Sequence, residues 1–240
     1  MAIQGDYLKK VYENGWKGVG FFNYNFGWQL FNRKLNNIII AFAIACILMI
    51  LYTSYLQSDH EIKTLIKSLT LGRREVLSIR AAYLILFSLI VGCIFYIPYY
   101  KAIWNNYFKQ DFSLLIQSLE RFENFPIALS IGQVFIISVL LKGLGILGIT
   151  LFMYFLSMWN MKKSVYQVSV MALIFMPLIL GFVDAPFNYL MFGGMFYGEE
   201  LLMDNFYKTC VYVGVMVVGL IVFGVVSVRK YIGNWEKGLR

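Results

Sequence analysis

Long apolar runs, separated by shorter polar stretches, form the main pattern of this chain. Each run is about twenty residues long and carries at most one charged residue. An α-helix rises 1.5 Å per residue, so roughly twenty residues cross the ~30 Å hydrocarbon core of a bilayer. We therefore predict an all-α, polytopic membrane protein with about five transmembrane helices in residues 37–240. The expected spans are residues 37–56, 81–100, 138–158, 165–183 and 209–228.

The polar interval of residues 58–80 has the pattern of an ordered helix, and we call it the elbow. Ser58 and Glu61 match the spacing of a capping box, which marks a helix start. Apolar residues then recur at i, i+3, i+4 and i+7, and lysines occupy another face. Gly72 is expected to interrupt this helix before the next span. The pattern predicts an amphipathic helix that lies along a membrane surface. Its stripe consists of Ile62, Leu65, Ile66 and Leu69.

Other parts of the chain fit this scheme less simply. Residues 1–36 are aromatic and polar without a long apolar run, so we expect an interfacial or outward-facing segment. Residues 126–159 are too long for one straight crossing. We favour one crossing preceded by an amphipathic or partly re-entrant stretch, and the alternative is a break near Gly143 and Gly145.

Pro177 predicts a kink in the fourth expected span. Glycines in the last span predict close helix packing. They are Gly214, Gly219 and Gly224.

Composition supports a membrane protein and argues against several other classes. The chain is 60% hydrophobic and 14% charged, with a mean hydropathy of +0.67, whereas soluble domains carry roughly 25% charged residues. The formal net charge of +8 comes from residues that flank the apolar runs instead of forming one patch, so we expect no nucleic-acid partner. The spacings of the three cysteines match no metal or redox motif.

The distribution of charge predicts the orientation. One side would hold the elbow, the turn at 160–164 and the C-terminal tail, with eleven cations against four anions, a net charge of +7. The other side would hold nine cations and nine anions. Cytoplasmic loops carry an excess of Lys and Arg, so the elbow is expected in the cytoplasm. Five crossings would then leave the N-terminus outside. Either a first span is missing from this chain, or the amphipathic segment of residues 1–36 does not cross the membrane.

No catalytic or metal-binding motif is evident. There is no G-x-x-x-x-G-K-[ST] sequence for a P-loop. Gly143 and Gly148 have the glycine spacing of that motif, but Ile149 stands at the lysine position, which favours helix packing. The single histidine, His60, excludes H-E-x-x-H metal sites. We therefore expect no metal, no cofactor and no enzymatic activity in this chain.

Lys142 is the main candidate for function within the spans. A lysine at bilayer depth is costly and usually faces a cavity or a partner. The alternative is that Lys142 snorkels from a helix that begins later than expected. Gln133 lies nine residues before it and is the second candidate for a substrate path.

The end of the elbow resembles a known cytoplasmic segment. The sequence Ser68-Leu69-Thr70-Leu71-Gly72-Arg73-Arg74-Glu75-Val76-Leu77 is similar to the short motif (small or hydroxyl residue, then Gly, Arg and an apolar residue) of bacterial ABC-2 type transporter permeases. The resemblance extends to the order of spans over residues 37–230, although the family's first of six spans has no counterpart here. It implies that the elbow is a cytoplasmic coupling helix. The expected partner-binding residues are Glu61, Lys63, Lys67, Gly72, Arg73, Arg74 and Glu75.

Membership of that family would have further consequences. The chain would be a multi-pass protein of the bacterial cytoplasmic membrane, paired with a second permease subunit as a homo- or heterodimer. An ATP-binding cassette subunit would bind ATP and Mg, and the substrate would be an amphiphilic peptide, antibiotic or lipid-like compound for export. Residues 1–36 would be an extracellular connector and residues 184–208 an outward-facing re-entrant region. The alternative function is a non-transporting scaffold or sensor subunit, in which the cations of the elbow only set the topology.

Overall fold

The computed structural model describes a helical bundle. It covers residues 36–51, 73–107, 112, 115–118, 122, 125–159, 161–176, 179–180, 191–197, 202 and 206–237. Within these ranges there is no β-strand, only one isolated antiparallel bridge between Leu115 and Ser130. The expected all-α class is therefore confirmed for the described residues. The expectations for residues 1–35 and for the elbow up to Gly72, including Glu61, Lys63 and Lys67, lie outside them.

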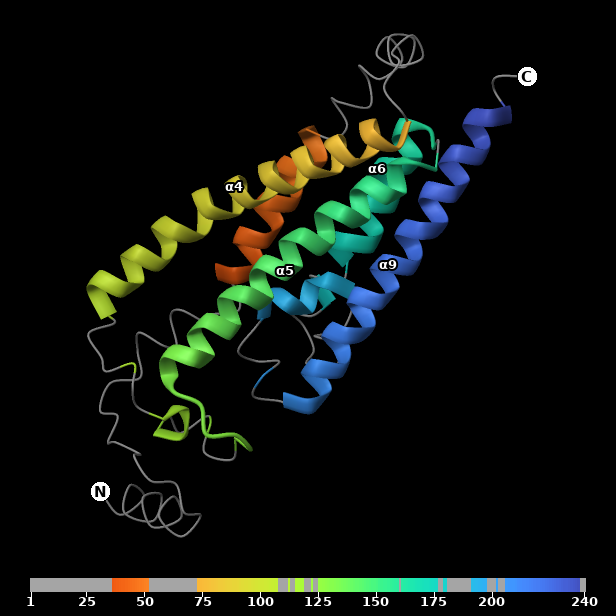
Figure 1. The fold of residues 1–240 in the computed structure, drawn as a ribbon. Helices are drawn as coiled ribbons and strands as arrows, with labels where there is room; N and C mark the ends of the chain where they lie inside the picture. The colour runs from red at the N-terminus through yellow and green to blue at the C-terminus, as the bar shows by residue number, and fades with distance from the viewer. Residues whose placement is uncertain are drawn as a thin grey trace.

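Three long helices dominate the bundle: α4 (Arg73–Tyr107), α5 (Ile131–Ser157) and α9 (Phe206–Lys237). By length and composition, segments of these three helices are apolar enough to cross a membrane, and no other described helix is. α5 lies between α4 and α9 (Figure 1). Its span has 50% of its residues buried, against 22% in α4 and 17% in α9. α5 is therefore the central helix of the three.

α4 joins the end of the elbow to the second expected span. Within the described residues it covers 35 residues from Arg73, with Pro98 inside it. Residues 73–80, which the sequence pattern placed in the elbow, form its first two turns. The end of the elbow and the second expected span therefore belong to one continuous helix.

α5 is longer than its expected crossing and is not broken at Gly143 or Gly145. It runs through both glycines from Ile131 to Ser157, about 40 Å at 1.5 Å per residue. Ser130 caps its first turn: the Ser130 hydroxyl accepts from the Gln133 N–H at 3.2 Å, and the Ser130 N–H donates to Gln133 Oε1 at 2.8 Å. This capping box explains the start at Ile131.

The other two expected spans are shorter in the described residues. The first appears as a 16-residue apolar helix, Asn36–Leu51. The fourth is helical over residues 163–176, where α6 (Lys163–Val170) continues into a π-helix, η3 (Met171–Phe175). The kink expected at Pro177 lies outside the described residues. Three of the five predicted spans therefore satisfy the length of a crossing within the part of the chain described.

Four helix ends meet at one end of the bundle. The start of α4, the end of α5, the start of α6 and the end of α9 lie at one end of the bundle (Figure 1). Two contacts agree with this: Tyr154 of α5 bonds Leu77 of α4, and Trp159 bonds Ser227 of α9. This is the end to which the charge distribution assigned the elbow, the 160–164 turn and the C-terminal tail.

A short 3-10 helix, η5 (Met191–Tyr197), lies inside the bundle against α5. Phe192 to Phe196 are all buried. A side chain at Gly148 would collide with the ring of Phe192, and one at Gly145 would lie 3.1 Å from Phe196 Cε2. The two glycines of α5 therefore make room for η5.

Candidate functional site

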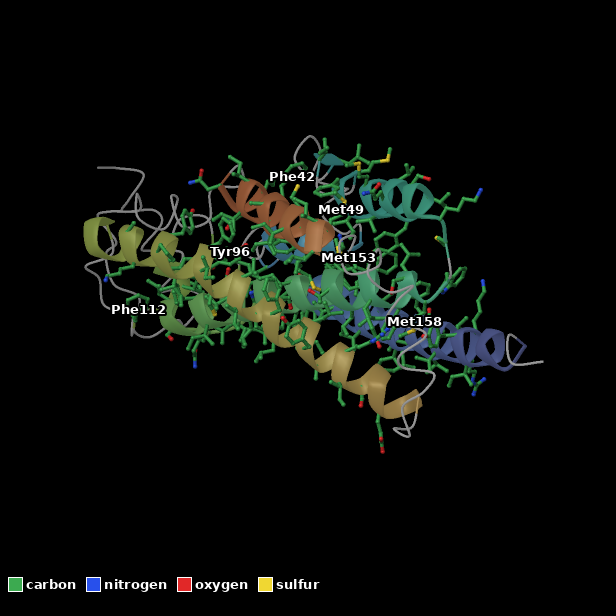
Figure 2. All side chains as sticks on the ribbon, turned by 90° about the horizontal axis from the view of Figure 1, so that it is seen from above. Phe42, Met49, Tyr96, Phe112, Met153 and Met158 are labelled. Atoms are coloured by element: carbon green, nitrogen blue, oxygen red, sulfur yellow. The ribbon has the colours of Figure 1, made fainter. Side chains whose placement is uncertain are left out.

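Lys142 of α5 is buried where α5 meets α4. Its side chain is 2% exposed and its Nζ lies 5.5 Å from the ring centroid of Tyr100 and 5.9 Å from that of Tyr96. Figure 2 shows Tyr96 among the side chains between the helices. We call Tyr96, Tyr100, Ser138 and Lys142 the seam. Tyr96 and Tyr100 are spaced i and i+4 on α4, and Ser138 and Lys142 have the same spacing on α5. The two pairs thus face one another between the two helices.

The aromatic rings stabilise the buried ammonium group. A lysine at the centre of a membrane helix costs roughly 2.5–3.5 kcal/mol on insertion scales. A cation within ~6 Å of a ring face gains about 2 kcal/mol or more when the pair is desolvated. Two rings lie within that distance, so the attraction is of the same order as the cost. Snorkelling does not describe this lysine, because α5 begins eleven residues earlier and the side chain is enclosed.

The tyrosines of the seam belong to a larger aromatic cluster. The rings of Tyr96 and Tyr100 stack with centroids 5.4 Å apart, and Tyr100 lies 6.0 Å from Phe135 of α5. Tyr99 contacts Tyr100 at 5.7 Å, and the Asn36 amide approaches the Tyr99 hydroxyl at 3.5 Å. The seam therefore lies between the main apolar core and a second apolar cluster near the start of α5.

Two buried hydroxyl groups of the seam lack a hydrogen-bond partner among the described residues: Tyr96 Oη and Ser138 Oγ. Ser138 is fully buried and Tyr96 is 7% exposed. Other helical hydroxyls donate to a carbonyl of the preceding turn, the usual arrangement for Ser and Thr in helices. They are Ser78, Ser88, Thr150, Ser157 and Ser227. An unsatisfied buried hydroxyl costs about 1–3 kcal/mol, so Tyr96 and Ser138 differ from these five residues.

The second predicted substrate-path residue, Gln133, does not join the seam. Nine residues at 100° each place it on the opposite face of α5 from Lys142, about 13 Å along the axis. Gln133 is exposed, and both its backbone N–H and its side chain are used in the capping box. In this structure it has a local structural role at the start of α5.

The predicted partner-binding residues fall partly within the described region. Arg73 and Arg74 form the start of α4, and Glu75 in the same turn is exposed. They lie at the end of α4 far from Tyr96 and Tyr100. α4 connects that end of the bundle to the two tyrosines of the seam.

The remaining seam residues were not singled out in the sequence, although two signals mark them. Tyr96 and Tyr100 form an i, i+4 pair near the end of an expected span, and Ser138 lies one turn before Lys142 on the same face. Helical spacing therefore predicts each pair. The facing of the two pairs depends on the antiparallel packing of α4 and α5.

The described residues of the seam offer binding groups, not an acid–base pair. The carboxylate residues of the described ranges, Glu75 and Glu236, lie near the other ends of α4 and α9. No group of three His, Cys, Asp or Glu residues able to hold a metal ion occurs in those ranges. Comparison of the chain with protein-family models, curated proteins and solved structures gave no match.

Proposed function

We propose that this chain is a permease subunit of an ATP-driven transporter of the ABC-2 type in the bacterial cytoplasmic membrane. It would export an amphiphilic compound, driven by a separate ATP-binding subunit that contacts the elbow, and pair with a second permease subunit. Three apolar helices of membrane length and the basic end shared by the elbow and tail support this proposal.

The observation that carries the proposal is η5. It packs against Gly145 and Gly148, near the middle of α5. If α5 crosses the membrane, the backbone of η5 would lie at membrane depth but inside protein. Interrupted backbone is tolerated at that depth only where protein buries it or where it lines a cavity. Discontinuous helices near the bilayer midplane are typical of transporters, where they form substrate sites. A scaffold subunit has no comparable need for one.

The continuity of α4 supplies a route for coupling. Its first turn carries Arg73, Arg74 and Glu75, and its last turns carry Tyr96 and Tyr100. A partner that binds the elbow differently in its two nucleotide states would tilt α4 and change the α4–α5 contact. The difference in those binding free energies would provide the energy of coupling.

Copurification tests the proposal. The tagged chain is expressed in its native host and extracted in mild detergent, and the proteins that copurify with it are identified by mass spectrometry. We expect a stable complex whose ATPase rate differs from that of the isolated ATP-binding subunit. The double variant Arg73→Glu/Arg74→Glu should insert into the membrane normally but lose that difference.

Lys162→Glu is the matched control, because Lys162 is an exposed cation at the same end of the bundle but outside the elbow. It should leave the complex and its ATPase rate unchanged. Failure to recover any ATP-binding subunit, with normal membrane insertion, would favour a scaffold or sensor.

A further inference from the structure

We propose that the seam binds the acidic head group, carboxylate or phosphate, of a single-chain amphiphile that enters between α4 and α5 from the hydrocarbon. Lys142 supplies the counter-charge, and the hydroxyl groups of Tyr96 and Ser138 donate hydrogen bonds to the head-group oxygens. The inference deepens the proposed function by naming a substrate class, and binding itself needs no ATP-binding subunit.

The chemistry of the seam matches an anionic oxygen ligand. Lys142 brings a cation with three N–H donors, and each hydroxyl can donate one hydrogen bond. Tyr96 Oη and Ser138 Oγ have no hydrogen-bond partner among the described residues although both are buried. Ser138 precedes Lys142 by one turn, and α-helical side chains lean toward the N-terminus of their helix, so the ammonium and the Ser138 hydroxyl lie along one face. Tyr96 faces the same ammonium from α4.

The surroundings favour an amphiphile over a free anion. The two helices of the seam are long and apolar enough to cross a membrane, and the tyrosines of the seam are packed in the apolar clusters on either side of it. A ligand that enters between these helices therefore passes through apolar surroundings, which favour an alkyl chain over a free, hydrated anion.

The closed seam explains why binding would depend on α4. Lys142 is enclosed by the rings of Tyr96 and Tyr100, so a head group reaches it only when α4 and α5 separate. α4 is the more exposed of the two helices. At its centre Gly92 sits against Ile146, where a Cβ would lie 2.8 Å from Ile146 Cδ1. The elbow-linked helix thus forms one wall of the proposed site.

Electron spin resonance of the full chain in phosphatidylcholine nanodiscs tests the proposal. The probe is stearate with a nitroxide on its alkyl chain, and the signal is the motionally restricted fraction. We expect restricted stearate that dodecyl phosphate displaces and that dodecyltrimethylammonium does not. Inorganic phosphate should fail to displace it. Displacement by inorganic phosphate as effective as by dodecyl phosphate would overturn the amphiphile and indicate a free-anion site.

Variants assign the binding to the seam. Lys142→Met should weaken stearate binding by about tenfold or more, because a charge-assisted contact is lost, whereas Lys142→Arg should retain it. Lys101→Met is the matched control, since Lys101 is an exposed cation next to Tyr100. Tyr96→Phe and Ser138→Ala should each weaken binding about threefold, and they remain informative if Lys142→Met does not fold.

Unchanged stearate affinity in Lys142→Met overturns the proposal. If Lys142→Met does not fold, unchanged stearate affinity in both Tyr96→Phe and Ser138→Ala overturns it instead. Equal displacement by the cationic amphiphile overturns it as well. The stearate measurements need no partner chain. If copurification fails but stearate binds normally, the transporter assignment is rejected and the seam proposal stands. A stable ATPase complex without stearate binding would reject only the seam.

Discussion

The hydroxyl of Tyr154 donates a hydrogen bond of 2.8 Å to the backbone carbonyl of Leu77. The bond joins the last turn of α5 to the second turn of α4, across 77 residues of sequence. It ties the two helices together at the end where α4 continues into the elbow. The start of α4 is thereby fixed to the central helix of the bundle.

Replacing Tyr154 with Phe should lower the thermal stability of the detergent-purified protein. One hydrogen bond contributes about 0.5–1.5 kcal/mol, and each kcal/mol shifts Tm by roughly 2–4 °C in a domain of this size. Differential scanning fluorimetry measures the shift. Tyr83→Phe is the control, because Tyr83 is 67% exposed on the outer face of α4. Equal Tm values for the two variants would contradict the role assigned to Tyr154.

A second contact joins α5 to α9 at the same end. The Trp159 indole N–H donates to Ser227 Oγ at 2.9 Å, and Lys230 Nζ lies 4.0 Å from the Trp159 ring centroid. Trp159→Phe and Ser227→Ala should each destabilise the protein, and the double variant should lose less than the sum. We expect a coupling energy of about 0.5–1.5 kcal/mol, typical of interhelical hydrogen bonds in membranes. Additive losses in chemical denaturation would show that the two side chains do not interact.

The three glycines predicted to pack in the last span differ in their surroundings. A Cβ at Gly224 would lie 2.7 Å from Phe155 Cζ, whereas Gly214 and Gly219 have no atom within 4 Å of that position. Only Gly224 therefore packs against another helix among the described residues. Gly224→Ala should destabilise the protein by about 1–3 kcal/mol through overpacking. Gly214→Ala, the matched control in the same helix, should be neutral or stabilising by up to about 1 kcal/mol. Thermal unfolding of both variants measures the difference, and similar losses would show that Phe155 moves aside easily.

Cysteine labelling checks the sidedness of the bundle. In a background without Cys46, Cys93 and Cys210, single cysteines replace Glu75, Lys162 and Pro126, which are all exposed. Glu75→Cys and Lys162→Cys should react with a membrane-impermeant maleimide only in inside-out vesicles, because their end carries the excess of positive charge. Pro126→Cys should react only in right-side-out vesicles. Labelling of Glu75→Cys from outside would reverse the orientation and remove the basis for an ATP-binding partner.

The apolar pattern alone located the three long spans, because hydropathy and length decide whether a helix can lie in a bilayer. The sequence also indicated that burying Lys142 costs free energy, because a lysine within an apolar run is unfavourable in a membrane wherever the helix packs.

Only the tertiary structure decided which groups meet. The pairing of Lys142 with Tyr96 and Tyr100 depends on how α4 and α5 are placed along each other, and a helical sequence specifies its faces but not its neighbours. The same holds for Gly224 against Phe155, in contrast to Gly214. η5 likewise packs against Gly145 and Gly148, a contact between segments that are far apart in the sequence. Such contacts arise from packing between segments distant in sequence, whereas hydropathy reports only the transfer of each residue out of water.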